Sequence, residues 1–215
     1  MDYAPPVTPT RILHADDEIL VVDKPAGLLS VPGKGAALAD CLIARLRAGW
    51  PGVLLVHRLD RDTSGVMVFA LTPRAQRHLG LQFEKRQTGK SYVALVAGVP
   101  DRRGGRIDLP IVVDWPNRPR QKICHETGRA AVTDWQLLGT PPPGGPSRLQ
   151  LVPQTGRSHQ LRLHCRELGH PILGDTLYAE ATATAHPRLM LHAERLALRH
   201  PVGGRRMEFR APCPF

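Results

Sequence analysis

The chain has 215 residues, which is enough for one large domain or two fused subdomains. Its formal net charge is +10 at pH 7, with 29 lysines and arginines against 19 aspartates and glutamates. This balance favours a polyanionic partner, nucleic acid before membrane. No apolar run approaches the roughly 18 residues of a membrane-spanning helix, so composition argues against an integral membrane protein.

The four cysteines are scattered and form no C-x-x-C pair, so a zinc site is not expected. Gly33-Lys34-Gly35 lacks the spacing and the Ser/Thr of a phosphate-binding loop, and no G-x-G-x-x-G follows a predicted strand. Residues 1–10 are rich in proline and do not resemble a signal peptide. We therefore expect a cytoplasmic protein with free thiols, no metal and no cofactor.

The pattern of apolar residues predicts the elements of the first half of the chain. Residues 1–10 are expected to form a flexible tail. After this tail the pattern predicts a strand over 18–23, an amphipathic helix over 36–48 and a strand over 66–71. Thr72 and Pro73 are typical of a helix N-cap and first helical position, so a helix is expected from there to about Lys85.

The second half of the chain is richer in strands. Apolar alternation predicts them over residues 91–98, 129–138, 148–153, 189–199 and 205–210. Ser158 is expected to cap a helix over residues 159–168, and Gly169 to end it. Because strands outnumber helices and several follow one another through short turns, the predicted fold class is α+β, with a mixed, mostly antiparallel sheet and flanking helices. We expect a single domain over residues 11–215.

A polar, charged segment from His57 to Gly65 runs directly into the apolar strand predicted over residues 66–71. A buried strand can hold such a loop in a fixed geometry, which suits a catalytic group. Asp60 is the candidate carboxylate, although an aspartate in a turn more often caps or solvates that turn. A glycosidase would need a second carboxylate such as Asp62. Neighbouring loop carboxylates rarely reach one bond from opposite sides, so Asp62 is expected to be a loop residue.

Two further blocks contain candidate functional residues. Residues 90–98 read Lys-Ser-Tyr-Val-Ala-Leu-Val-Ala-Gly, and Tyr92 in this block is one of only three tyrosines. Residues 155–164 read Thr-Gly-Arg-Ser-His-Gln-Leu-Arg-Leu-His, and Leu-Gly-His-Pro-Ile-Leu-Gly-Asp follows over residues 168–175. On the helix predicted there, His159, Arg162 and Leu163 share one face, so Arg162 could point inward beside an apolar neighbour.

The three blocks resemble the signature motifs of the pseudouridine synthases of the RluA family. The resemblance extends to residues 16–27 and to segments near residues 191–201, so it covers nearly the whole chain. It implies a pseudouridine synthase catalytic domain that isomerises uridine in RNA to pseudouridine, without metal, cofactor or energy source. In that reaction the N1–C1′ bond breaks, the uracil turns while held, and a C5–C1′ bond forms.

The resemblance also implies roles for five side chains. Asp60 is the catalytic residue, and whether it attacks C1′ or takes a proton from C2′ stays open. Arg162 pairs with Asp60 and keeps it ionised through a charge-assisted bond. Arg58 fills the space that the flipped base leaves, Tyr92 packs on the uracil, and Leu163 presses on the detached ring.

Within the family, residues 114–122 and 125–128 resemble a segment of the short members, which lack an accessory RNA-binding domain of the S4 type. This implies two RNA partners, a hairpin of 23S ribosomal RNA and the anticodon stem-loop of some tRNAs. Residues 102–129 hold seven basic side chains and a tryptophan. They favour an RNA-backbone contact, with a solvated sheet edge as the alternative. We expect a monomer.

Two other functions fit parts of the sequence. An RNA-binding protein of the same fold without catalysis would have no need for Asp60, Tyr92 and Arg162 together. A nucleobase deaminase would need zinc ligands, and the chain lacks the combination of an H-x-E motif with a P-C-x-x-C motif. The sequence therefore favours the isomerase.

Overall fold

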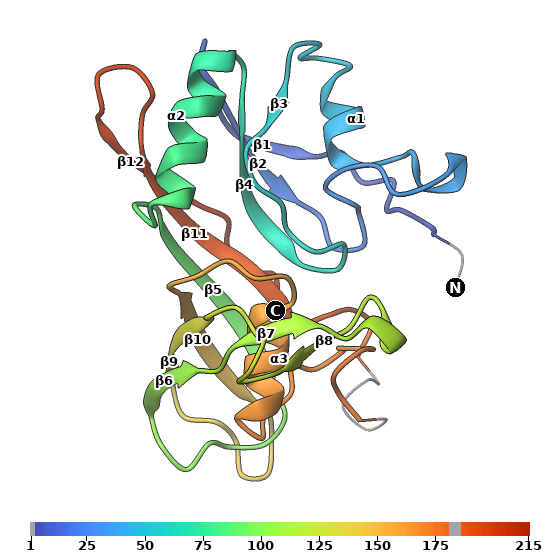
Figure 1. Ribbon diagram of the computed structural model, residues 1–215, viewed down its shortest axis with the longest axis vertical. Coiled ribbons are helices and arrows are strands. Elements are labelled where there is room, and N and C mark those ends of the chain that lie inside the picture. The colour runs from blue at the N-terminus through green and yellow to red at the C-terminus, as the bar shows by residue number, and fades with distance from the viewer. Residues whose placement is uncertain (1–2, 181–185) are drawn as a thin grey trace. The chain divides into compact units, whose positions relative to one another are not determined.

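The computed structural model describes residues 3–180 and 186–215, which form two compact units (Figure 1). Unit 1 contains the described residues up to Lys90 together with His192–Pro214, and unit 2 contains those within Ser91–Leu191 together with Phe215. The chain passes between the units within strands β5 (Gly89–Val96) and β11 (Leu191–Arg199). This division is finer than the single domain expected over residues 11–215, which stays a prediction.

The sheet of unit 1 has a fully buried central strand. Strand β4 (Ser64–Ala70) is buried at all seven positions, and it pairs antiparallel with β2 (Ile19–Lys24). The next strands are β1 (Arg11–Ala15) beside β2, β11 beside the start of β4, β12 (Arg206–Arg210) beside β11, and β3 (Leu54–Leu55) beside the end of β4. Strand β4 confirms the apolar strand predicted over residues 66–71 and starts two residues earlier.

Gly65 permits the close contact between β4 and β11, which are parallel at this point. Its φ of +114° lies in a region that disfavours L side chains, and an added Cβ would lie 2.2 Å from the carbonyl oxygen of Ala193. The first two residues of β4 can therefore pair with β11 only because residue 65 is glycine.

The helices of unit 1 match the predictions unequally. Helix α2 (Pro73–Glu84) begins as predicted, and the Thr72 hydroxyl accepts a hydrogen bond from the Ala75 amide at 3.1 Å. The continuous helix predicted over residues 36–48 is wrong: the chain forms a short 3₁₀ turn, η1 (Ala36–Leu38), and then helix α1 (Leu42–Leu46). Cys41 between them has extended backbone angles, φ −160° and ψ 167°. This extended residue interrupts the helix although the apolar spacing continues.

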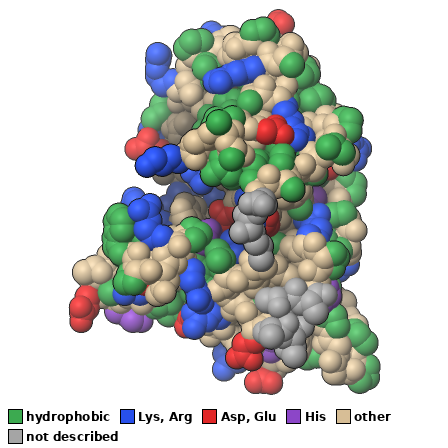
Figure 2. All heavy atoms as spheres, turned by 90° about the vertical axis from the view of Figure 1, so that its right-hand side faces the viewer, with side chains coloured by type: hydrophobic (Ala, Val, Ile, Leu, Met, Phe, Trp, Pro, Cys, Tyr) green, Lys and Arg blue, Asp and Glu red, His purple; other side chains and the backbone are tan. Residues whose placement is uncertain are grey.

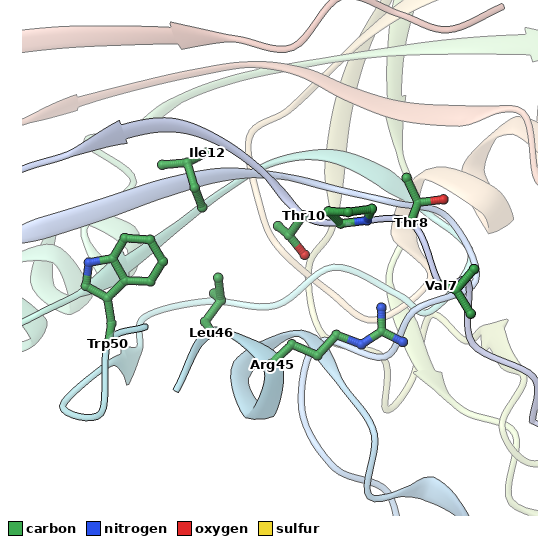
Figure 3. A pocket seen from close by; sticks show the side chains of 8 residues that line it. Val7, Thr8, Thr10, Ile12, Arg45, Leu46 and Trp50 are labelled. Atoms are coloured by element: carbon green, nitrogen blue, oxygen red, sulfur yellow. The ribbon is translucent and has the colours of Figure 1, made fainter. Parts of the chain in front are cut away.

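Residues 3–10, expected to form a flexible tail, contact unit 1 at several points. The Tyr3 hydroxyl donates to the Asp40 carbonyl at 2.9 Å, and Arg45 Nη1 donates to the Pro6 carbonyl at 2.7 Å. A groove of about 500 Å³ lies between this segment and α1, and Figure 3 shows Trp50 and Ile12 at one end of it. No predicted site residue lines this groove.

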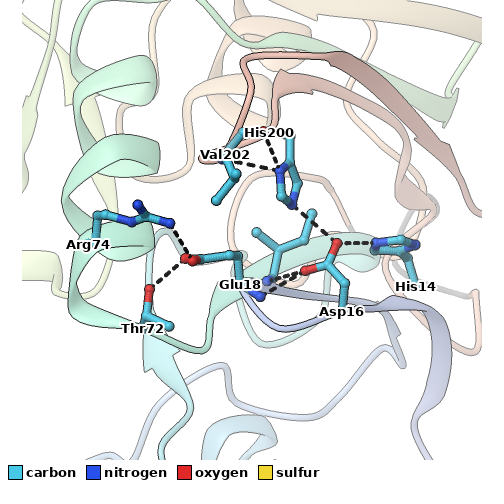
Figure 4. Close-up of polar contacts among 8 residues, drawn as sticks. His14, Asp16, Glu18, Thr72, Arg74, His200 and Val202 are labelled. Atoms are coloured by element: carbon cyan, nitrogen blue, oxygen red, sulfur yellow. Dashed lines mark hydrogen bonds and ion pairs between the residues drawn. The ribbon is translucent and has the colours of Figure 1, made fainter.

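Asp16 joins the turn before β2 to the loop between β11 and β12 (Figure 4). Its Oδ1 accepts from the Ile19 amide at 2.8 Å, and its Oδ2 lies 2.7 Å from His14 Nε2 and 3.2 Å from His200 Nε2. Burial opposes the charged form, but these contacts outweigh it and lower the pKa of Asp16 to about 2. The cluster links β1 and the turn before β2 to the loop that follows β11.

In its described residues, unit 2 is an antiparallel sheet covered by one helix. Its strand order is β5, β10 (Ser147–Pro153), β9 (Val132–Leu138) and β6 (Gly104–Asp108). Helix α3 (Gln160–Glu167) packs Leu161 and Cys165 into the apolar cluster of this sheet. Burial raises the pKa of the Cys165 thiol to about 12, so this cysteine is a core residue.

A small hairpin was not predicted from the sequence. Strands β7 (Ile111–Val113) and β8 (Gln121–Ile123) pair antiparallel, and the 3₁₀ turn η2 (Trp115–Asn117) lies between them. Strands β1, β3 and β6 were not predicted either. These five strands have two to five residues, which is too short for an alternating apolar pattern to be recognised.

The predicted α+β class is confirmed. Pairings within each unit are antiparallel apart from the parallel contact between β4 and β11. In the described part of the chain, every helix is too short or too polar to cross a bilayer.

Candidate active site

The loop that carries Asp60 (residues 56–63, the Asp60 loop) connects β3 to β4 in unit 1. The buried lysine Lys24 contacts it from the end of β2: its Nζ donates to the carbonyls of Arg61 and Thr63, both at 2.8 Å, and to that of Pro25 at 2.9 Å. Lys24 has 0% exposed surface. Burying an ammonium group costs free energy unless its N–H groups are hydrogen-bonded, and these three carbonyls accept the hydrogen bonds that Lys24 needs. The same bonds fix the backbone of the loop after Asp60.

Asp60 is partly buried, and its carbonyl accepts a hydrogen bond from the Thr63 amide at 3.2 Å, which closes a turn. Arg58 is exposed. Asp62 accepts two hydrogen bonds from Arg61, at 2.8 and 3.0 Å. This side-chain pair within the loop agrees with the expected loop role of Asp62 rather than that of a second catalytic carboxylate.

His57 supports the start of the same loop as a neutral side chain. Its ring stacks on Phe83 with centroids 4.5 Å apart, and its Nε2 accepts from the Val68 amide at 3.1 Å. Because Nε2 accepts, the proton of the neutral ring is on Nδ1. Burial, assisted by the charge of Lys90, lowers the pKa of His57 to about 3. His57 is therefore uncharged at neutral pH and holds the loop against β4.

This lowered pKa predicts a pH-dependent stability. The unfolded chain binds a proton at His57 below pH 6.5, whereas the folded chain binds one only near pH 3. The contribution of His57 is thus complete above pH 6.5 and is lost as pH falls, by up to about 1.4 kcal/mol per pH unit. Burial also lowers the pKa of His164, which adds to the slope with the same sign.

Urea unfolding between pH 5 and 7 measures the slope of the unfolding free energy against pH. Asp16 and Glu208 each have a pKa of about 2 in the folded chain and titrate below this pH range. His57→Asn should have a shallower slope than the wild type, and His125→Asn, at a surface position, should keep the wild-type slope. Equal slopes in all three proteins would contradict a His57 that stays neutral in the folded chain.

The second group of candidate residues lies in unit 2, around the start of α3. The helix begins at Gln160 rather than at His159, and His159 is the N-cap residue with a left-handed φ of 54°. The predicted cap by Ser158 is therefore wrong. Gln160 instead organises this turn: its Oε1 accepts from the Thr155 hydroxyl at 2.7 Å and from the Arg157 amide at 3.0 Å, and its Nε2 donates to β9.

Arg162 forms a buried, two-bond ion pair with Asp175. Its Nε and Nη2 donate to the two carboxylate oxygens at 2.8 and 2.6 Å, and its side chain is 5% exposed. Asp175 also accepts from the amides of Leu177 and Tyr178. The partner predicted for Arg162 is Asp60. Asp60 belongs to unit 1 and Arg162 to unit 2, so that pairing stays a prediction.

Tyr92 and Leu163 differ in their exposure. Tyr92 is partly exposed on β5, where it pairs with Leu151 of β10. Leu163 is fully buried in a cluster with Ile111 and Tyr178. A contact between Leu163 and a substrate base therefore stays a prediction that requires a neighbouring group to move.

Two residues that support these sites, Lys24 and Asp175, have no role predicted from the sequence, although both lie in motifs that carry the family resemblance. Lys24 directly follows the apolar strand predicted over residues 18–23, but a charged residue at such a position is weak evidence for a buried role, because most such residues are solvated. In the described residues, no group of three or more His, Cys, Asp and Glu side chains could hold a metal ion.

The chain resembles known proteins over its whole length. The family described as RNA pseudouridylate synthase matches residues 18–167. The curated dual-specificity RNA pseudouridine synthase RluA of Escherichia coli is 50% identical over 216 residues, covering 100% of this chain and 98% of that protein. The protein of the same name from Pasteurella multocida is 47% identical over 217 residues, covering 100% and 99%.

Solved structures give the same result. Human RNA pseudouridylate synthase domain containing 1 superposes with a TM-score of 0.81 at 32% identity, covering 99% of this chain and 86% of that chain. Human RNA pseudouridylate synthase domain containing 4 superposes with a TM-score of 0.74 at 27% identity, covering 95% of this chain and 88% of that chain. The chain therefore belongs to the RNA pseudouridylate synthase family.

Proposed function

We propose that this RNA pseudouridine synthase modifies uridines in two classes of RNA, a hairpin of 23S ribosomal RNA and the anticodon stem-loop of some tRNAs. The support is the resemblance to relatives named dual-specificity RNA pseudouridine synthase, at 47–50% identity over 100% of this chain. A protein of this size would recognise the shape of a short loop and a few unpaired bases, which is how single-stranded RNA is commonly read.

We propose that Asp60 is the catalytic residue. As a nucleophile it would attack C1′ and displace N1 of the uracil; as a base it would take the C2′ proton and leave a glycal. In both routes the uracil turns and C5 bonds to C1′. In the first route C5 displaces the Asp60 carboxylate from C1′, and in the second Asp60 returns the proton to C2′ as C5 adds to the glycal. The C5 proton is then lost and N1 ends protonated, so the product is an isomer of the substrate. The supporting observation is the fixed backbone of the Asp60 loop, held by Lys24, because a catalytic group needs a defined position.

The other site residues would act on the flipped base. We propose that Arg58, which is exposed, occupies the space that the base leaves. Tyr92 would pack on the uracil, a contact of the type worth about 1–3 kcal/mol, and would offset part of the cost of flipping. Leu163 would limit the movement of the detached ring, and Arg162 would keep Asp60 ionised.

The hairpin of β7 and β8 carries a candidate RNA-binding surface. Trp115 is 68% exposed, and the guanidinium of Arg118 lies 4.6 Å from the centre of its ring. Lysine and arginine side chains are spread over the face viewed in Figure 2. An exposed aromatic ring beside a cation suits stacking on an unpaired base next to a phosphate.

This surface predicts separable effects of two substitutions. Trp115→Ala should weaken RNA binding by about 1–3 kcal/mol with little change in the salt dependence. Arg118→Ala should reduce the slope of log K against log salt by about 0.7, the contribution of one phosphate contact on a single strand. Arg74→Ala, an exposed arginine of α2, is the matched control and should leave both quantities unchanged. Wild-type affinity and slope in both hairpin variants would exclude this surface from binding.

Mapping of pseudouridine in total RNA tests the proposed function. RNA from cells with the gene, without it, and with an Asp60→Asn copy is compared. The proposal expects sites in both 23S rRNA and tRNA to be lost in the last two strains. Loss in only one RNA class would contradict dual specificity, and no loss would contradict the assigned substrates.

We further propose that the enzyme is a cytoplasmic monomer. Its four cysteines are free, which fits a reducing compartment. Sedimentation at assay concentration tests the monomer, and a dimer mass there would contradict it.

A further inference from the structure

Ser30 contacts both backbone polar groups of Leu59, the residue directly before Asp60. Its hydroxyl donates to the Leu59 carbonyl at 2.7 Å and accepts from the Leu59 amide at 3.2 Å. Ser30 is 3% exposed and Leu59 is 7% exposed. A serine hydroxyl has one proton to donate and lone pairs to accept with, so this one side chain satisfies both groups of Leu59 where water has little access.

Ser30 is itself held in place by its neighbours. Its carbonyl accepts from the Ile43 amide at 3.3 Å, and the carbonyl of Leu29 accepts from the Leu42 amide at 2.8 Å, both at the start of α1. The Leu29 amide donates to the Tyr3 hydroxyl at 3.0 Å. Because α1 and the N-terminal segment fix the backbone at residues 29 and 30, the Ser30 hydroxyl is a fixed point against which Leu59 is placed.

The two contacts to the Asp60 loop are complementary. Ser30 holds residue 59 before Asp60, and Lys24 holds residues 61 and 63 after it. The hydrogen bond from the Thr63 amide to the Asp60 carbonyl closes the turn but lies within it. By itself, this bond does not fix the backbone that precedes Asp60. The Cα position of Asp60 is thus defined from both sides.

We propose that Ser30 is a positioning residue for Asp60: its hydroxyl fixes the backbone of Leu59 and thereby the point from which the carboxylate reaches the ribose. The inference rests on the proposed catalytic role of Asp60. A displacement of about 1 Å in a catalytic group can cost about 10²-fold in rate, so loss of this hydroxyl should affect the chemical step far more than the binding of RNA.

The test compares Ser30→Ala with Ser147→Ala. Ser147 is also buried, at 0% exposure, and its hydroxyl also donates to a backbone carbonyl at 2.7 Å, that of Gly98 in unit 2. Single-turnover rates at saturating enzyme are measured on an RNA that the wild type modifies, below the melting temperature of each variant. Ser30→Ala should lower the rate by about 10- to 100-fold with RNA affinity within about threefold. Ser147→Ala should lower the melting temperature but keep the wild-type rate.

Ser30→Cys covers the case in which Ser30→Ala does not fold. The thiol has similar size but is a weaker donor and acceptor, so a folded Ser30→Cys should have a rate clearly below that of the wild type. A wild-type rate in either folded Ser30 variant overturns the proposal, as does an equal loss of rate in Ser147→Ala. If Asp60→Asn is inactive while Ser30→Ala is fully active, only the role of Ser30 fails. If Asp60→Asn is active, the catalytic assignment on which it rests fails.

Discussion

Asp60→Asn is expected to lower the single-turnover rate of pseudouridine formation by at least about 10³-fold. The amide has almost the shape of the carboxylate, but it is neither an anionic nucleophile nor a base at neutral pH. Lys24 and Ser30 contact the backbone of the Asp60 loop, and these contacts remain in the variant, so the loop should keep its conformation. RNA affinity should change by less than about threefold, because phosphate contacts to basic side chains dominate it.

Asp62→Asn is the matched control for this substitution. It removes the same charge two residues away, from a carboxylate that accepts hydrogen bonds from exposed Arg61. An exposed pair of this kind contributes at most about 1 kcal/mol, so rate and stability should stay close to those of the wild type. Rates are measured at pH 7 with both variants shown to be folded. A near-normal rate for Asp60→Asn, or an equal loss in Asp62→Asn, would remove Asp60 from the centre of the reaction.

Long elements with consistent local signals could be predicted from the sequence. Helix α2 combines an N-cap at Thr72, proline at its first position and apolar residues at helical spacing, so all levels agree. Strand β4 is apolar at every position after Gly65, as a doubly covered strand should be. The position of Asp60 in the loop directly before this strand followed from the same pattern.

Contacts between distant residues could not be predicted. The left-handed conformation of His159 has no sequence signal, and it moved the helix start by one residue away from Ser158. Cys41 breaks the helix predicted over residues 36–48 although its apolar character continues the pattern. In the sequence, Lys24 resembles a solvated charge at the end of a strand. In the fold, it is buried and donates to carbonyls of the Asp60 loop, which lies far from it in the sequence. In each case tertiary contacts decided the structure, and local propensity did not.

Removing Asp175 alone should destabilise unit 2. Asp175→Asn keeps an oxygen that can accept from the Leu177 and Tyr178 amides, but it removes the negative charge that faces the buried guanidinium of Arg162. Removing one partner of a buried ion pair typically costs about 3–5 kcal/mol. Urea unfolding at pH 7 measures the loss. Arg106→Ala, which breaks an exposed pair with Asp134, should cost no more than about 1 kcal/mol.

The double variant Arg162→Met with Asp175→Asn separates the ion pair from the fold around it. With both charges removed, no unpaired ion is buried, and methionine fills much of the volume of the arginine stem, so the double variant should be more stable than Asp175→Asn alone. It should nevertheless be inactive if Arg162 keeps Asp60 ionised during the reaction. Recovery of stability without recovery of rate would thus assign Arg162 a role beyond its contact with Asp175. A stable double variant with wild-type turnover would confine Arg162 to the structure of unit 2.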